Sequence, residues 1–316
     1  MDISAAGAHC RNILQQVGRV IVGREDVLRK FLTAVVANGH ILIEDFPGLA
    51  KTLMAKAFSA ALGCDFARVQ FTPDLLPSDI IGSYVYNQKT NSFELRRGPI
   101  FTNILLADEI NRSPPKTQAA LLEAMMERQV TIEGNTFRLG PPFIVIATQN
   151  PIELEGVYPL PEAQLDRFAI KIGVGYPSMA EELEILARRR ERRSDEWRLE
   201  SVVDRSTLLE IQRMVEDVEV HPDIEEYIVR IARSTREHQL VEMGVSPRGT
   251  QMLWHLCRAH ALVNGRDYVI PDDVKAMAVP CLSHRIVLRA GTWVQGIKPQ
   301  HIIEELLLKT PVPRVV

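Results

Sequence analysis

The loop DFPGLAKT, residues 45–52, contains the residue types that bind phosphate groups. It follows the apolar run ILIED (41–45) and precedes a segment of good helix formers (53–63), which predicts a strand, a loop and a helix. Lys51 at the helix start can reach the β- and γ-phosphates of a nucleotide, and Thr52 can ligate Mg²⁺. The first helical turn adds free N–H groups and the positive end of the helix dipole. The alternative is a lysine at an ordinary helix N-terminus.

Two adjacent acids, Asp108 and Glu109, follow an apolar run in the segment ILLADEINR (104–112). Ligands of parallel α/β sheets bind at the carboxyl ends of the strands. There Asp108 would hold the water shell of Mg²⁺, and Glu109 would orient and deprotonate a water that attacks the γ-phosphate. An isolated Asp-Glu pair can also cap a helix, but its place after a Lys-Thr loop in the same chain favours the chemical interpretation.

Asn150 ends a further apolar run, FIVIATQNP (143–151). Its amide offers the donor and the acceptor that would position a water or sense the γ-phosphate. The alternative is an Asn-Pro turn, so the position at a strand end carries the functional interpretation.

Two arginines complete the set of candidate residues. Arg167 lies just before an expected strand, where it either forms a salt bridge with Asp166 or acts as a finger that reaches a neighbour's nucleotide. Arg248 lies in the first turn of an expected helix. Ser246 as N-cap and Pro247 at the first helical position explain that helix start without any nucleotide, so a purely structural role stays open.

Short apolar runs alternate with segments that can hold crossover helices. This predicts an α/β fold with a parallel sheet covered on both faces. The expected strands are 41–45, 68–72, 104–108, 143–148 and 169–173, with a helix at 116–130 and two helices within 8–38. Residues 83–98 alternate at period two around Asn87–Asn91, which predicts an inserted β-hairpin. We assign this hairpin only a general role in coupling nucleotide state to a substrate.

From about residue 176 onward the sequence has helical patterns only. The candidate helices are 204–217, 222–240, 248–264, 271–284 and 299–309. We expect an α/β nucleotide-binding domain at 1–187 and a helical lid domain at 188–316. Acids interleave the basic run at 188–193, which is typical of a solvated helix face.

The composition is that of a soluble globular protein rather than a disordered or fibrous one. The 316 residues carry 37 Lys+Arg against 40 Asp+Glu, a net charge of −3, which counts against a nucleic-acid-coating protein. The four scattered cysteines lack metal-ligand spacing and are expected to be reduced and structural. The N-terminus has no apolar signal core, and no stretch approaches about 18 uninterrupted apolar residues, so we expect a cytoplasmic protein without a membrane span.

Taken in order, the motifs resemble the MoxR-type AAA+ ATPases over nearly the whole chain. The segments that carry the resemblance are IVGRED (21–26), HILIEDFPGLAKT (40–52), LLADEINRSPPKTQAALLEAMMERQVT (105–131), IATQNPIELEGVYPLPEAQLDRF (146–168), SPRG (246–249) and LSHRIVLR (282–289). The ordered set is far more specific than any one of its members.

The resemblance implies that ATP and Mg²⁺ are bound. Lys51 and Thr52 would belong to the Walker A motif and Asp108 to Walker B, with Thr52 and Asp108 on the metal side. The residues that would contact the nucleotide are Val22, Gly23, Pro47, Gly48, Leu49, Ala50, Lys51, Thr52 and Leu53.

The resemblance also implies the catalytic roles. Glu109 would be the Walker B base, Asn150 sensor 1, Arg167 the arginine finger and Arg248 sensor 2. An arginine finger makes chemical sense only in trans, so hydrolysis should depend on assembly.

The family implies a sheet order of 5-1-4-3-2, an all-helical lid and a ring oligomer, usually a hexamer. It further implies chaperone-like remodelling or maturation of a protein client, with a von Willebrand factor A-domain protein as partner. Neither the client nor the partner is encoded in any motif of this chain.

One departure from the family pattern lies in the phosphate loop, where Asp45 stands at the position of a glycine, while Ala50 is ordinary for the family. A carboxylate that pointed at the triphosphate would cost on the order of 1–4 kcal/mol. Asp tolerates left-handed backbone better than most residues, so the loop can still turn. On this basis Asp45→Gly is predicted to tighten ATP binding.

The leading hypothesis is therefore a Mg²⁺-dependent ATPase that remodels a protein client. A second hypothesis is an ATP-binding assembly scaffold with little turnover, although such a scaffold has no chemical need for Glu109. A third is a nucleic-acid motor of the same superfamily, against which the net charge and the absence of a basic appended domain count.

Overall fold

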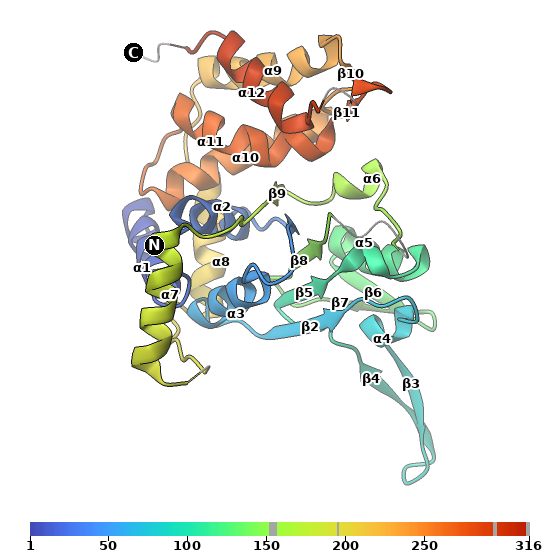
Figure 1. Ribbon diagram of the computed structural model, residues 1–316. Coiled ribbons are helices and arrows are strands. Elements are labelled where there is room, and N and C mark those ends of the chain that lie inside the picture. The colour runs from blue at the N-terminus through green and yellow to red at the C-terminus, as the bar shows by residue number, and fades with distance from the viewer. Residues whose placement is uncertain (152–156, 195, 293–295, 314–316) are drawn as a thin grey trace.

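The computed structural model describes residues 1–151, 157–194, 196–292 and 296–313. At its centre is a parallel sheet with the strand order β2-β5-β8-β1-β9 (Figure 1). The strands are β1 (Ile41–Glu44), β2 (Phe66–Gln70), β5 (Ile104–Asp108), β8 (Ile144–Gln149) and β9 (Ile170–Ile172). Counted along the chain, these five strands have the expected order 5-1-4-3-2, and the predicted α/β class is confirmed.

The two faces of the sheet are covered by different helices because successive strand residues point to opposite sides. Ile41 and Ile43 pack with α1 (Ile3–Gly18), α2 (Glu25–Val36) and α3 (Lys51–Ala61). Leu42 packs on the other face, where α4 (Pro77–Ile81) and α5 (Pro115–Glu127) lie. All three strand residues are completely buried. The near-continuous apolar runs of the sequence thus match a sheet that is buried on both faces.

Two β-hairpins extend from the second face. The expected one consists of β3 (Gly82–Asn87) and β4 (Ser92–Arg97), and it projects well away from the body of the molecule (Figure 1). The sequence analysis missed the other, β6 (Gln129–Ile132) and β7 (Asn135–Arg138). Its two-residue turn, Glu133-Gly134, has φ of 47° and 82°, the backbone that such tight hairpin turns require. The Asn135 amide donates to the Tyr84 hydroxyl at 3.3 Å, so the two hairpins touch.

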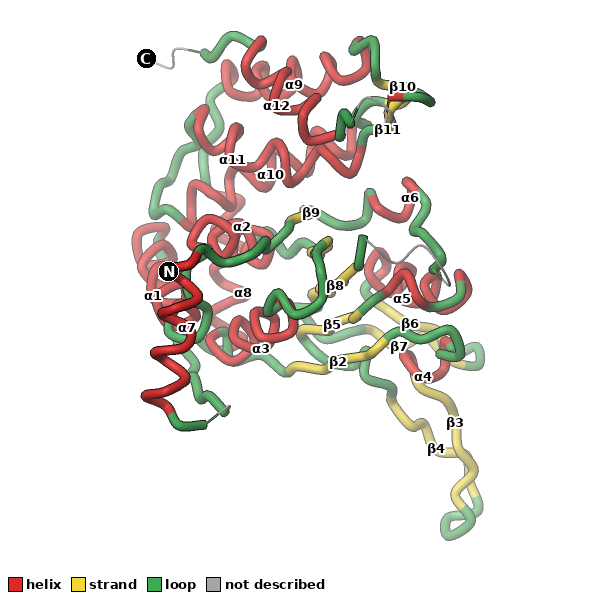
Figure 2. Tube along the Cα trace, viewed as in Figure 1, coloured by secondary structure: helices red, strands yellow, loops and turns green. Residues whose placement is uncertain are grey.

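The second half of the chain is mainly helical (Figure 2). It contains α7 (Met179–Arg192), α8 (Arg205–Met214), α9 (Pro222–Glu237), α10 (Pro247–Val263), α11 (Pro271–Leu282) and α12 (Pro299–Lys309). The expectation of helices alone was wrong in one detail, because β10 (Val241–Met243) pairs with β11 (Val287–Leu288). These strands are too short to show a period in the sequence.

The helical part packs onto the α/β part through a shared hydrophobic core. One buried cluster runs from α1 and α2 into α8, α10 and α11, and α10 lies against α2. The division expected between residues 187 and 188 falls inside α7. The chain between the two parts is therefore a continuous helix at that point.

Candidate functional site

A cavity of about 400 Å³ lies at the carboxyl ends of the parallel strands. Its lining comes from the loop after β1, the start of α3, and the ends of β2, β5 and β8. The lining residues are Pro47, Gly48, Ala50, Lys51, Thr52, Leu53, Arg68, Asp108, Glu109 and Asn150. All of these except Arg68 are predicted site residues. The structure thus brings together the predicted nucleotide-binding Lys51 with the predicted metal-binding and catalytic residues Thr52, Asp108, Glu109 and Asn150. We call this space the phosphate cavity.

The loop that opens α3 is shaped for an anion. Gly48 has φ of 82°, and Ala50, the N-cap residue, has φ of 55° in the left-handed region. Ala50 has no side chain that could cap the helix, so the first-turn N–H groups have no side-chain cap. The Lys51 ammonium donates to the Asp45 carbonyl at 2.6 Å and so stays over the loop. Leu49 is buried and does not line the phosphate cavity.

Asp45 does not direct its carboxylate into this loop. One oxygen accepts from the Phe46 N–H at 2.8 Å, and the other accepts from the N–H groups of Val174 and Gly175 at 2.7 and 2.6 Å. Arg24 reaches the same segment and donates to the Gly175 carbonyl at 3.2 Å. The prediction that Asp45→Gly tightens ATP binding assumed an inward carboxylate, and the structure corrects that assumption. Asp45 ties the phosphate loop to the chain that follows β9.

Asp108 is held by two partners from neighbouring strands. Its Oδ1 accepts from the Thr148 hydroxyl at 2.6 Å, and its Oδ2 accepts from Arg68 Nη2 at 2.7 Å and Nε at 3.1 Å. Thr148 is completely buried in β8, and it also accepts from the Glu109 N–H at 2.8 Å. One hydroxyl therefore fixes both acids relative to the sheet.

Glu109 turns away from the strand direction, with φ of 58° and ψ of 49°. A non-glycine residue in the left-handed region carries strain of order 1–3 kcal/mol and is commonly found at functional sites. Its carboxylate accepts from the Gln70 amide at 2.6 Å and from Arg112 Nη1 at 3.0 Å. The carboxylate that would act as base is thus held by two donors in this conformation.

The sequence analysis missed three residues of this network, Arg68, Gln70 and Thr148. Arg68 and Gln70 flank the buried Val69 on β2, so they lie on the same side of the strand. The sheet order places β2 beside β5, with Gln70 level with Asp108. The alternation in the sequence together with the implied strand order could have found both residues.

Arg167 and Arg248 do not line the phosphate cavity. Arg248 Nε lies 4.0 Å from the Asp166 carboxylate, and both of its terminal nitrogens lie 3.9 Å from the Met126 sulfur on α5. Arg167 lines a separate cavity of about 280 Å³ beside α5, with Glu123 among its neighbours. Its Nε is buried without a hydrogen-bond partner. Both arginines therefore lie beside Met126 and near α6 (Glu162–Leu165), apart from the other five residues.

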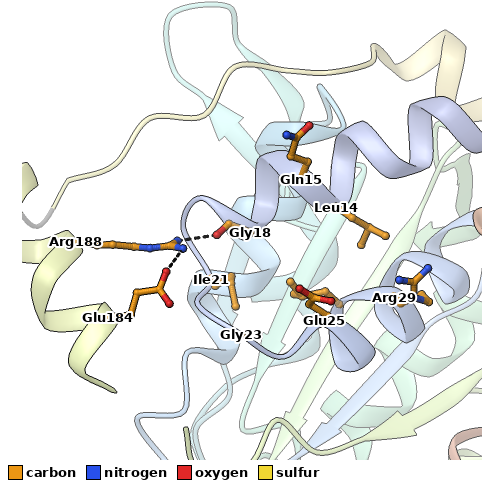
Figure 3. A pocket seen from close by; sticks show the side chains of 10 residues that line it. Leu14, Gln15, Gly18, Ile21, Gly23, Glu25, Arg29, Glu184 and Arg188 are labelled. Carbon is orange, nitrogen blue, oxygen red and sulfur yellow. Dashed lines mark hydrogen bonds and ion pairs between the residues drawn. The ribbon is translucent and has the colours of Figure 1, made fainter. Parts of the chain in front are cut away.

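Gly23 lines a third cavity, of about 470 Å³, between the end of α1, the start of α2 and α7 (Figure 3). Its φ of 66° would strain any other residue, and an added Cβ would lie 1.8 Å from a Glu181 carboxylate oxygen, which would have to move. Arg188 closes one side by donating to the Gly18 carbonyl at 2.7 Å (Figure 3). Val22 is buried and lines neither this cavity nor the phosphate cavity.

The oxygen donors of the phosphate cavity suit Mg²⁺. The cavity contains the Thr52 hydroxyl and the Asp108 carboxylate. Mg²⁺ keeps several waters and is usually bound by one or two protein oxygens together with phosphate oxygens. Consistent with that pattern, the described residues contain no group of three or more His, Cys, Asp or Glu that could form an all-protein metal cage.

Buried cysteines and histidines lie outside the cavity. The four cysteines are free, as expected, and burial raises the pKa of Cys10 to about 12. Burial lowers the pKa of His40 to about 3 and that of His284 well below its usual value.

No helix in the described part of the chain could cross a membrane.

Comparison with known protein families places this site in a defined class. Residues 40–170 match the family model for the ATPase family associated with various cellular activities (AAA), and residues 233–306 match the AAA lid domain. The chain is thus an AAA ATPase domain followed by its lid.

Individual relatives narrow the class. The chaperone MoxR1 of Mycobacterium tuberculosis is 44% identical over 95% of this chain and 81% of its own length. An uncharacterised Bacillus subtilis protein, YeaC, is 49% identical over 95% of this chain and 94% of its own. A crystal structure from Cytophaga hutchinsonii, described as a candidate ATPase, superimposes with a TM-score of 0.91 at 41% identity and covers 99% of this chain and 97% of its own. The chain belongs to the MoxR family of AAA+ ATPases.

Proposed function

We propose that this protein hydrolyses ATP with Mg²⁺ and uses the reaction to remodel a protein client. The observation that carries this proposal is the meeting of Lys51, Thr52, Asp108, Glu109 and Asn150 around one cavity at the carboxyl ends of parallel strands. Membership of an ATPase family supports ATP as the nucleotide.

The chemistry follows from the groups around the phosphate cavity. Lys51 and the first turn of α3 bind the phosphates, and Mg²⁺ held through Thr52 and Asp108 would neutralise charge on the β- and γ-phosphate oxygens. Glu109 takes a proton from the attacking water. The oxygen of this water then bonds to the γ-phosphorus, while the bond between the γ-phosphorus and the β–γ bridging oxygen breaks. The Asn150 amide orients that water or the γ-phosphate.

The Glu109 carboxylate is restrained through one of its two oxygens. Gln70 and Arg112 both donate to its Oε2, whereas the backbone N–H stays anchored on Thr148. The backbone contact with Thr148 positions this base, and the hydrogen bonds from Gln70 and Arg112 restrain its carboxylate.

A neighbouring copy of the chain would complete the site. Arg167 and Arg248 lie together beside α5 and α6 rather than in the phosphate cavity of their own chain. We infer that both arginines serve the nucleotide of the next subunit in a ring, which we propose to be a hexamer. An arginine supplied in trans stabilises the charge that develops on the transferred phosphoryl group.

The biological setting is proposed from relatives. MoxR1 is named a chaperone, which supports remodelling or maturation of a protein client. A von Willebrand factor A-domain protein as partner and a cytoplasmic location are proposed from the family resemblance of the sequence motifs. The projecting β3–β4 hairpin is the candidate for client contact, because Tyr86 and Phe93 are 48% and 70% exposed near its tip. The two rings pack edge to face at 5.3 Å.

The test is steady-state ATP hydrolysis with Mg²⁺ over a range of protein concentrations, with molar mass recorded by light scattering. The variants are Glu109→Gln and Arg167→Ala, with Glu226→Gln as control because Glu226 is an exposed lid acid paired with Arg230. We expect turnover to rise with assembly, to be lost in both site variants and to persist in the control. Assembly on ATP with native turnover no higher than that of Glu109→Gln would instead support the scaffold.

A further inference from the structure

A buried arginine of the lid, Arg285, binds the chain segment that carries Arg167. It lies in the short turn Ser283–Arg285, and its side chain is only 2% exposed. Its Nε donates to the Asp166 carboxylate at 2.8 Å, and its Nη2 donates to the carbonyls of Asp166 and Phe168 at 3.1 and 2.7 Å. Its Nη1 donates to the Ala169 carbonyl at 3.3 Å. One guanidinium thus holds both sides of Arg167.

The neighbouring His284 reinforces the same contact. Its buried Nε2 lies 3.0 Å from the Phe168 carbonyl and 2.7 Å from Arg285 Nη1, so it donates to that carbonyl in one tautomer and accepts from Arg285 in the other. Burial and the adjacent guanidinium lower the pKa of His284 well below its usual value, so the ring is neutral and does not repel Arg285.

The helix that carries Arg248 leaves room for this arrangement. Gly249 follows Arg248 in the first turn of α10, and a Cβ there would lie 2.9 Å from Arg285 Cδ and 2.8 Å from a Val245 methyl carbon. Ser246 caps the turn by accepting from the Gly249 N–H at 3.1 Å. The glycine of the SPRG motif is therefore explained by the passage of Arg285.

Asp166 connects the buried arginine with the exposed one. Its Oδ1 pairs with Arg285 at 2.8 Å, and its Oδ2 lies 4.0 Å from Nε of Arg248, whose side chain is 52% exposed. The first contact is short and buried, whereas the second is long and solvated and so contributes little. Arg285 anchors Asp166, and Arg248 stays free to turn toward another group.

We infer that Arg285 is a positioning residue that holds the backbone of Arg167 at a fixed distance from that of Arg248 by clamping residues 166–169 onto the lid. We call these three arginines with Asp166 the arginine cluster. The inference rests on the proposed function, in which Arg167 and Arg248 serve a neighbour's ATP. Because the clamp joins strand β9 to the lid, both arginines would move as one unit when subunits shift. A displacement of about 1 Å in such a unit can cost about 10²-fold in rate.

Two variants distinguish a positioning role of Arg285 from a contribution to the stability of the fold alone. Arg285→Lys keeps a positive charge but cannot span four acceptors. Arg258→Met is the matched control, because Arg258 is also a buried lid arginine, 5% exposed, but bonds to Val218 and Glu216. In Arg285→Lys we expect kcat to fall by about 10- to 100-fold with KM for ATP unchanged, because the phosphate cavity is untouched. In Arg258→Met we expect a lower melting temperature with kcat retained.

A mixing experiment tests the role in trans. Chains with Arg285→Lys have an intact phosphate cavity, and chains with Glu109→Gln have an intact arginine cluster. Mixed assemblies should therefore hydrolyse ATP faster than the sum of the two variants alone. Equal kcat in Arg285→Lys and the native chain, or no gain on mixing, would overturn the inference.

Hydrogen exchange tests whether Arg285 holds residues 166–169, and it does so without ATP hydrolysis. Amides of residues 162–169 should exchange about tenfold faster in Arg285→Lys but not in Arg258→Met. Unchanged exchange in Arg285→Lys would disprove the clamp. A native chain that does not hydrolyse ATP would instead reject the proposed function, so the two failures are distinguishable.

Discussion

The phosphate cavity and the arginine cluster differ in how they are built. The cavity groups lie at the ends of adjacent strands, and a single buried hydroxyl, that of Thr148, fixes Asp108 and Glu109. The arginine cluster joins Asp166 to Arg285, which are 119 residues apart, through the docking of the lid. The phosphate cavity is therefore formed by the α/β part alone, whereas the arginine cluster exists only when two parts of the chain are packed together. If the arginines act on a neighbour's nucleotide, as we propose, ATP binding and transition-state stabilisation can be controlled separately.

The strongest test of this separation is Arg167→Ala. We expect turnover of the assembled protein to fall by about 10³-fold or more, while the Kd for ATP stays unchanged, because Arg167 lies outside the cavity. Turnover and equilibrium nucleotide binding measured on the same preparation check this. Arg138→Ala, at an exposed position of β7, is the control. A large loss of ATP affinity in Arg167→Ala would mean that this arginine binds the nucleotide of its own chain.

Within the cavity, Thr148→Val is expected to have the next largest effect. Valine keeps the shape but leaves the Glu109 N–H and an Asp108 oxygen without their partner, which costs about 1–3 kcal/mol of stability. We expect turnover to fall by about 10²-fold through misplacement of the base. Unfolding curves and turnover measure the two effects. Thr136→Val, at an exposed position of β7, controls for the substitution, and a native kcat in Thr148→Val would refute the anchoring role.

The sequence predicts the cavity better than the cluster, for a physical reason. Strand ends in a parallel sheet meet at one edge, so Lys51, Asp108 and Asn150 could be placed together from their positions after apolar runs alone. The predicted bounds of β5 and α12 agree with the structure to the residue. The resemblance implies that Arg167 acts in trans, outside the cavity of its own chain. The docking of the lid has no local sequence pattern, so the position of Arg248 beside the same helix could not be predicted.

Other differences also arise from tertiary contacts. The predicted effect of Asp45→Gly depends on a carboxylate that faces phosphate, and nothing local reveals that the N–H groups of Val174 and Gly175 approach that carboxylate. Strands β10 and β11 have no detectable period because they are only three and two residues long. The β6–β7 hairpin could have been found from its Glu-Gly turn.

Substitution of Asp45, which joins the phosphate loop to the chain after β9, is expected to have a smaller effect. In Asp45→Asn the side chain can no longer accept three N–H groups with full negative charge, so we expect a loss of about 1–3 kcal/mol in unfolding free energy. We expect ATP affinity to stay equal or fall, because the loop loses its tie to Val174 and Gly175. Calorimetric unfolding and nucleotide titration measure both quantities. Asp45→Gly with tighter ATP binding would show that the carboxylate opposes the phosphates after all.

Gln70→Ala is expected to have the smallest effect, and it should raise turnover, whereas Arg167→Ala and Thr148→Val should lower it. Gln70 donates to the Glu109 carboxylate at 2.6 Å, and this hydrogen bond holds Oε2 toward β2. Removing a bond worth about 1 kcal/mol should raise basal turnover about fivefold. Turnover of the assembled variant, compared with Gln88→Ala near the tip of the β3–β4 hairpin, measures it. A drop in turnover would mean that Gln70 holds the base in its productive position. A rise would place the restraint on hydrolysis at β2, beside the phosphate cavity, and leave the arginine cluster as the element through which a neighbour acts.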